Sequence, residues 1–149
     1  MRVWASLYVI VWLTVLELLI AIDPRPPSWA LYVHIGLGVL IVLVAAWNYL
    51  RLRETEAPGR IKRTVRATFG ISVAMAFLGV LLWANVGAGW NLVLGYSVWD
   101  VIHIFHVLNG LAILAQAAAA ATAFDMWEEK EFEHPTRPGE IPEPAPMTT

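Results

Sequence analysis

Four side chains that could do chemistry lie well inside long apolar segments of the chain. Glu17 lies in the first apolar segment, His34 in the second, and His103 and His106 in the fourth. Ionisable residues within membrane-spanning helices are costly, generally face the interior of a bundle and mark functional sites. The chain has no cysteine, which excludes thiolate catalysis, iron–sulfur clusters and cysteine-type zinc sites. Imidazole is therefore the favoured metal ligand in these segments.

The spacing of these side chains places them in one layer of a membrane. Counted from the predicted ends of their segments, Glu17, His34 and His103 each lie six residues deep, which corresponds to about 9 Å at 1.5 Å per residue. His106 lies one helical turn deeper than His103. Three different helices thus bring one carboxyl group and three imidazoles to a similar depth.

Two histidines on different helices of a bundle are what a low-spin b-type haem requires. Each imidazole supplies one axial nitrogen, and the porphyrin stands between the helices. Gly38 and Gly110 follow His34 and His106 at the same spacing, His-x-x-x-Gly, so each leaves room for a flat macrocycle one turn along the same face. The sequence therefore predicts His34 and His106 as the axial pair, with His103 as the alternative to His106.

Several other roles remain open for these residues. His103 could contact a haem propionate or a proton path, and Asn109 could hydrogen-bond an imidazole or a propionate. Glu17 either serves a proton or quinone site, together with His103, or extends toward the outer headgroups. His34 and His106 could also be interhelical hydrogen-bonding residues. A zinc or copper site formed by Glu17, His34, His103 and His106 is a further alternative.

The amino-acid composition indicates that this layer of side chains is surrounded by lipid. Of the 149 residues, 58% are hydrophobic and 15% are charged, with a mean hydropathy of +0.61. A soluble domain carries about 25% charged residues, and a disordered chain is much less apolar. The formal net charge of -2 does not indicate a nucleic-acid partner. The composition predicts an integral membrane protein in contact with the lipid bilayer.

Four segments are apolar and long enough to span a membrane, which predicts an all-α, four-helix up-down bundle. The expected spans are Val3–Ile22, Trp29–Leu50, Ala67–Val86 and Val98–Phe124. We expect residues 1–127 to form the bundle. Residues 128–149 form a polar, Pro-rich tail that is expected to be disordered from residue 135.

Basic residues predict how the bundle is oriented. The connection Arg51–Arg66 contains six of them: Arg51, Arg53, Arg60, Lys62, Arg63 and Arg66. The positive-inside rule places this connection, and with it both termini, in the cytoplasm. We therefore expect a multi-pass protein of the plasma membrane whose histidine layer lies in the outer half of the bilayer.

Two motifs resemble known membrane proteins. Tyr32-Val-His34-Ile-Gly-Leu-Gly38, followed by an apolar run to Arg51-Leu-Arg53, resembles the His-bearing helix of the cytochrome b561 family. His103-Ile-Phe-His106-Val-Leu-Asn-Gly110 resembles a helix of small four-span prokaryotic membrane proteins. The resemblance implies a bis-histidine haem b and electron exchange with quinol or a partner redox protein. Dihaem members of the b561 group carry a second histidine pair, which this sequence lacks, so the chain alone is not expected to transfer electrons across the membrane.

These observations predict a membrane-bound cytochrome with a single haem b near the outer face. It would pass electrons between a quinol and a partner redox protein. The small size indicates a subunit of a larger redox complex, or a homo-oligomer, rather than a stand-alone enzyme. The alternative is a haem-free accessory or assembly subunit whose histidines are structural.

Overall fold

The protein is all-helical over the residues that the computed structural model describes, which are 3–21, 27–92 and 95–133. Four helices make up the fold: α1 (Val3–Ala21), α2 (Ala30–Arg53), α3 (Gly59–Trp83) and α4 (Val98–Glu133). Each is long and apolar enough to cross a membrane. Within these ranges the extended structure is an isolated bridge between Asn91 and Ser97. The predicted all-α membrane fold is confirmed.

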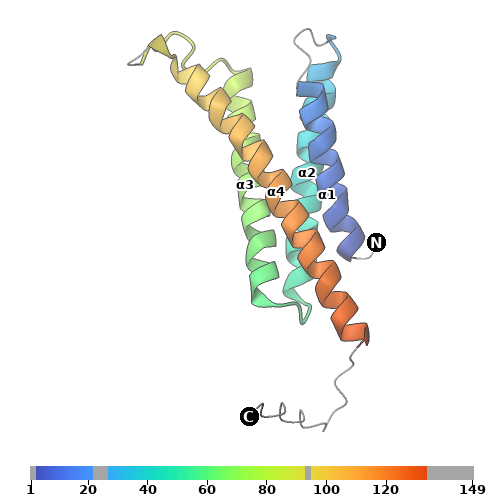
Figure 1. Ribbon diagram of the computed structural model, residues 1–149. Coiled ribbons are helices and arrows are strands. Elements are labelled where there is room, and N and C mark those ends of the chain that lie inside the picture. Colours follow the sequence, from blue (N-terminus) through green and yellow to red (C-terminus); the bar gives the residue numbers. More distant parts are fainter. Residues whose placement is uncertain (1–2, 22–26, 93–94, 134–149) are drawn as a thin grey trace, which may run out of the picture.

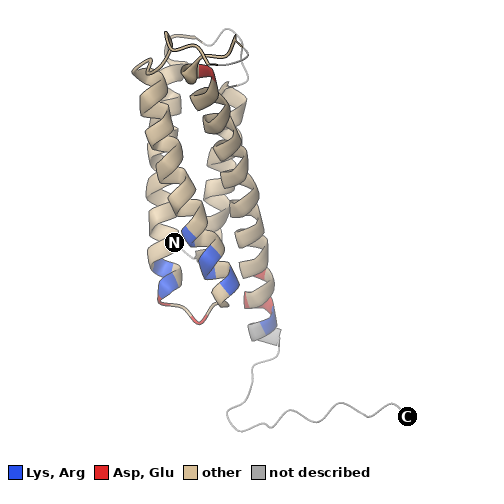
Figure 2. Ribbon diagram, turned by 90° about the vertical axis from the view of Figure 1, so that its left-hand side faces the viewer, with Lys and Arg blue, Asp and Glu red and all other residues tan. Residues whose placement is uncertain are grey.

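The helices run alternately up and down in a closed four-helix arrangement (Figure 1). Each helix packs against the next one along the chain, and α4 packs back against α1. The start of α1 and the end of α4 lie at the same end of the bundle as the α2–α3 connection (Figures 1 and 2). We call this end the basic end, because the lysines and arginines among the described residues gather there (Figure 2), and the opposite end the histidine end.

Two helices extend beyond the apolar spans expected from the sequence. Helix α3 begins at Gly59 rather than near Ala67, and α4 continues to Glu133 rather than ending near Phe124. Apolarity sets the length that lipid can cover, whereas Arg, Lys and Glu are good helix formers that continue a helix into water. The first residues of the expected tail are therefore helical. The disorder predicted from residue 135 onward lies outside the described residues.

The hydrophobic core fills the basic end and the middle of the bundle. One cluster includes Leu7, Leu52, Ile61, Val65 and Phe124, and a second includes Ile10, Ile41, Ala45, Ile113 and Ala117. Buried polar groups join helices at these depths. Asn48 Nδ2 donates to the Ser6 carbonyl oxygen at 3.1 Å, and Thr68 Oγ1 donates to Gln116 Oε1 at 3.3 Å.

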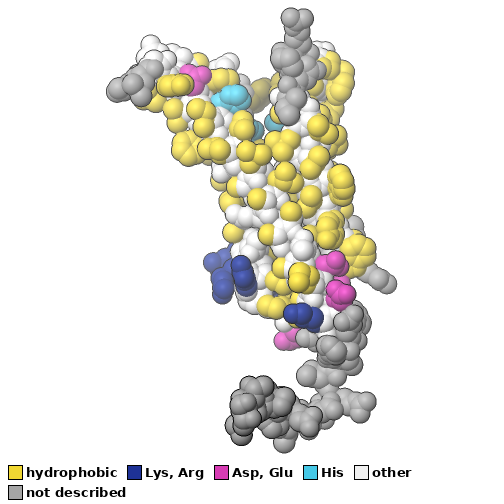
Figure 3. Space-filling model, viewed as in Figure 1, with side chains coloured by type: hydrophobic (Ala, Val, Ile, Leu, Met, Phe, Trp, Pro, Cys, Tyr) yellow, Lys and Arg dark blue, Asp and Glu magenta, His cyan; other side chains and the backbone are white. Residues whose placement is uncertain are grey.

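The bundle opens toward the histidine end. Helices α1 and α2 diverge there from α3 and α4 (Figure 1), and the space-filling view shows a hollow between the two pairs with histidine side chains beside it (Figure 3). Both core clusters lie between this hollow and the basic end of the bundle. The fold thus places a closed apolar floor beneath an open gap between two helical hairpins.

Candidate functional site

Glu17 and His34 form a contact between α1 and α2 at the floor of this gap. Glu17 is only 4% exposed, and its Oε2 pairs with Nδ1 of His34. Neither carboxyl oxygen has a hydrogen-bond partner among the described residues, so the contact with His34 is an ion pair. A buried carboxylate is costly unless a partner compensates for lost water. The imidazole of His34 is that partner, and the contact fixes which nitrogen of His34 is engaged.

His106 is held on the opposite side of the gap by the backbone of α3. Its Nδ1 lies 3.2 Å from the carbonyl oxygen of Met75. Gly79 makes this approach possible, because a Cβ at that position would lie 3.3 Å from His106 Cε1. Without a side chain at residue 79, the ring reaches a helix backbone that is otherwise covered.

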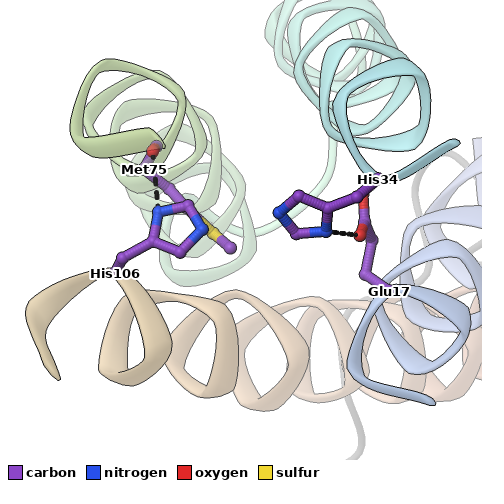
Figure 4. Close-up of polar contacts among 4 residues, drawn as sticks. All are labelled: Glu17, His34, Met75 and His106. Atoms are coloured by element: carbon purple, nitrogen blue, oxygen red, sulfur yellow. Dashed lines mark hydrogen bonds and ion pairs between the residues drawn. The ribbon is translucent and has the colours of Figure 1, made fainter. Parts of the chain in front are cut away.

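The two imidazoles face each other across the gap. Their ring centroids are 6.0 Å apart, and their planes are inclined at 64°. Figure 4 shows that each Nδ1 is occupied by its own partner while the second ring nitrogens of His34 and His106 point toward one another. Two imidazoles on opposite faces of one metal ion have centroids about 6 Å apart, since each metal–nitrogen bond is about 2 Å. The separation therefore fits a pair of axial ligands.

The glycines singled out from the sequence lie against side chains of the site. A Cβ on Gly38 would lie 3.7 Å from Glu17 Oε1, and one on Gly110 would lie 3.2 Å from Met75 Cε. Gly110 therefore gives room to the methionine side chain, whereas a Cβ on Gly38 would make only an ordinary contact with the carboxyl group. Gly79, which the spacing argument missed, is the glycine in contact with a histidine ring.

His103 lies apart from the facing pair. Its side chain is exposed, and its ring packs on Trp99 with centroids 5.2 Å apart. Residues three apart on a helix differ by about 60° in direction, so His103 and His106 face different surroundings. Asn109 is half-buried on the next turn of α4.

The four side chains of the zinc or copper alternative are not brought together in the part of the chain that the structure describes. No group of three or more His, Asp or Glu residues in those ranges is placed to hold a metal ion. The reason is the outward position of His103, which leaves two imidazoles and a carboxyl group that is already engaged by His34.

One curated protein shares sequence with part of the chain. Over 72 residues the chain is 35% identical to a haem A synthase from Bradyrhizobium sp. (strain ORS 278). The match covers 46% of this chain and 18% of that protein, so the chain spans less than a fifth of the relative. No family model matches the chain, and no solved structure matches it.

Proposed function

We propose that the chain is a membrane haem protein that binds one haem b at the histidine end, with His34 and His106 as axial ligands. The main support for this proposal is the pair of imidazoles, whose ring centroids are 6.0 Å apart. Nδ1 of His34 contacts Glu17 and Nδ1 of His106 contacts the Met75 carbonyl oxygen. The partial similarity to a haem A synthase supports a role connected with haem. The resemblance to cytochrome b561 rests on one motif, Tyr32–Gly38 followed by an apolar run to Arg51-Leu-Arg53.

The contacts of both histidines match what iron ligands need. A metal-ligating histidine almost always donates its other N–H to a carboxylate or backbone carbonyl, which fixes the tautomer and the ring orientation. Glu17 supplies the carboxylate in contact with Nδ1 of His34, and the Met75 carbonyl supplies the acceptor beside Nδ1 of His106. When bound, the haem would supply a reversible one-electron carrier. The apolar floor of Ile41 and Ile113 would keep water from the inner side.

We further propose that electrons pass between a quinol in the membrane and a partner redox protein on the same side. A single ligand pair at one end of the bundle does not connect the two faces of a bilayer, which favours a subunit of a larger complex or a homo-oligomer. The positive-inside rule favours the outer face for this pair. His103, exposed beside Trp99, is better placed than the buried Glu17 to take a proton from a quinol at the surface.

The absorption spectrum of the purified full-length protein tests this function. We expect a red protein whose reduced-minus-oxidised difference spectrum is that of a low-spin haem b. A folded but colourless preparation from haem-replete cells would contradict the proposal. In that case the alternative of an accessory subunit holds, and the same histidine contacts serve only to position the helices.

Valine in place of Gly79 tests the close packing around His106. Its Cβ would press on the ring and move Nδ1 away from the Met75 carbonyl. We expect the dissociation constant for haem to rise about 10-fold, as for loss of other partners of metal ligands. Gly70→Val on the same helix is the control, because nothing lies within 4 Å of a Cβ there. Equal effects in haem titrations of the two variants would rule out this role for Gly79.

A further inference from the structure

A cleft between α2 and α3 at the basic end is unused by the proposed function. Six residues line it: Tyr49, Leu52, Arg53, Lys62, Arg63 and Arg66. Arg53 comes from the last turn of α2, and the other three cations come from the first two turns of α3. Figure 2 shows lysine and arginine residues of both helices at this end. The two acidic residues of the connection, Glu54 and Glu56, do not line the cleft.

Two of the four cations of the cleft, Arg53 and Lys62, are held by contacts that do not neutralise their charge. The Arg53 guanidinium lies 5.7 Å from the centroid of the Tyr49 ring, and Lys62 Nζ donates to the carbonyl oxygen of Thr55. The ion pair found within the described residues is that of Glu17 and His34, so no described carboxylate pairs with these four residues. Clustered cations without a counter-charge attract an anion.

An aromatic pair continues the cleft toward the middle of the bundle. Tyr49 of α2 stacks on Phe69 of α3, with centroids 5.7 Å apart and planes inclined at 9°. Arg53 lies one helical turn beyond Tyr49, and Arg66 lies about one turn before Phe69. Both aromatic side chains are half-buried, so part of their surface stays open to lipid. Cations at the mouth with an apolar surface one turn deeper match a ligand that has an anionic head and an apolar tail.

We propose that this cleft binds an anionic phospholipid such as phosphatidylglycerol. Its phosphate would lie among Arg53, Arg63 and Arg66, and an acyl chain would lie along the aromatic pair. Arginine presents planar donors that suit phosphate oxygens, and basic pockets between membrane helices bind anionic headgroups. A free phosphate would use the cations alone and leave the aromatic surface without a role, which favours the lipid.

Native mass spectrometry of the full chain in detergent tests the proposal with phosphatidylglycerol, phosphatidylcholine and inorganic phosphate as probes. We expect phosphatidylglycerol to bind at least about 10-fold more tightly than phosphatidylcholine, and inorganic phosphate not to displace it at equal concentration. Arg63→Gln/Arg66→Gln should weaken phosphatidylglycerol binding about 30-fold, because each basic residue near an anionic lipid contributes about a factor of five.

The matched control is Arg51→Gln/Arg60→Gln. It removes the same charge at the same end of the bundle from residues that do not line the cleft, and we expect less than a threefold loss. Equal losses in both double variants, equal binding of the two lipids, or displacement by inorganic phosphate would each overturn the proposal. If the first double variant does not fold, Arg66→Gln against Arg60→Gln makes the same comparison on α3.

Discussion

Alanine at His106 is expected to give a protein that folds but carries no low-spin haem b spectrum, and alanine at His34 is expected to do the same. Each substitution removes one of the two facing imidazoles, whose ring centroids are 6.0 Å apart, so a haem would lose one of its two axial nitrogens. The measurement is the reduced-minus-oxidised difference spectrum per mole of purified protein. Imidazole added to His106→Ala should restore part of the low-spin bands, because it replaces the missing ligand.

His103→Ala is the matched control, since it removes a histidine of the same helix that lies outside the facing pair. Its exposed ring packs on Trp99, so we expect the spectrum to be retained. Loss of the bands in His103→Ala together with their retention in His106→Ala would show that the ligand assignment is wrong. Thermal unfolding of all three variants separates loss of haem from loss of fold.

Depth along the helices is the part of the site that the sequence could predict. Counting residues from the expected helix ends places Glu17, His34, His103 and His106 in one layer. The structure brings three of them together, and His103 lies apart, exposed beside Trp99. Counting works because a helix rises by a constant 1.5 Å per residue, and because short connections hold neighbouring helices antiparallel. The ends of α3 and α4 were less predictable, since polar helix formers carry both helices past their apolar spans.

The sequence does not predict how each helix is rotated about its own axis, that is, which of its faces meets a neighbouring helix. The helices of this chain are apolar on nearly every side, so periodicity does not indicate which face meets a neighbour. The pairing of Glu17 with His34, and the outward position of His103, therefore became visible only in the structure. Gly79 was missed for the same reason: its partner, His106, lies on another helix, whereas the His-x-x-x-Gly pattern compares positions along one helix.

Leucine in place of Glu17 is expected to weaken haem binding about 10- to 100-fold, the range found when a partner of a metal ligand is removed. Glu17 is buried and pairs with Nδ1 of His34, so leucine leaves that nitrogen without an acceptor and the ring free to turn. Thr14→Val is the control on α1, because the Thr14 hydroxyl donates to the Ile10 carbonyl oxygen of its own helix. Haem titration of the apoprotein gives the dissociation constants.

Glutamine at the same position separates charge from geometry. Its amide oxygen can accept a hydrogen bond from His34 Nδ1–H, so we expect haem affinity to stay close to that of the unmodified protein. The negative charge is gone, however, and a carboxylate partner raises the basicity of a ligating imidazole, which stabilises the oxidised metal. The midpoint potential of Glu17→Gln should therefore rise, as measured by spectroscopic redox titration. An unchanged potential would mean that Glu17 only fills space beside Gly38, whereas a loss of affinity equal to that of Glu17→Leu would mean that the charge itself holds His34 in place.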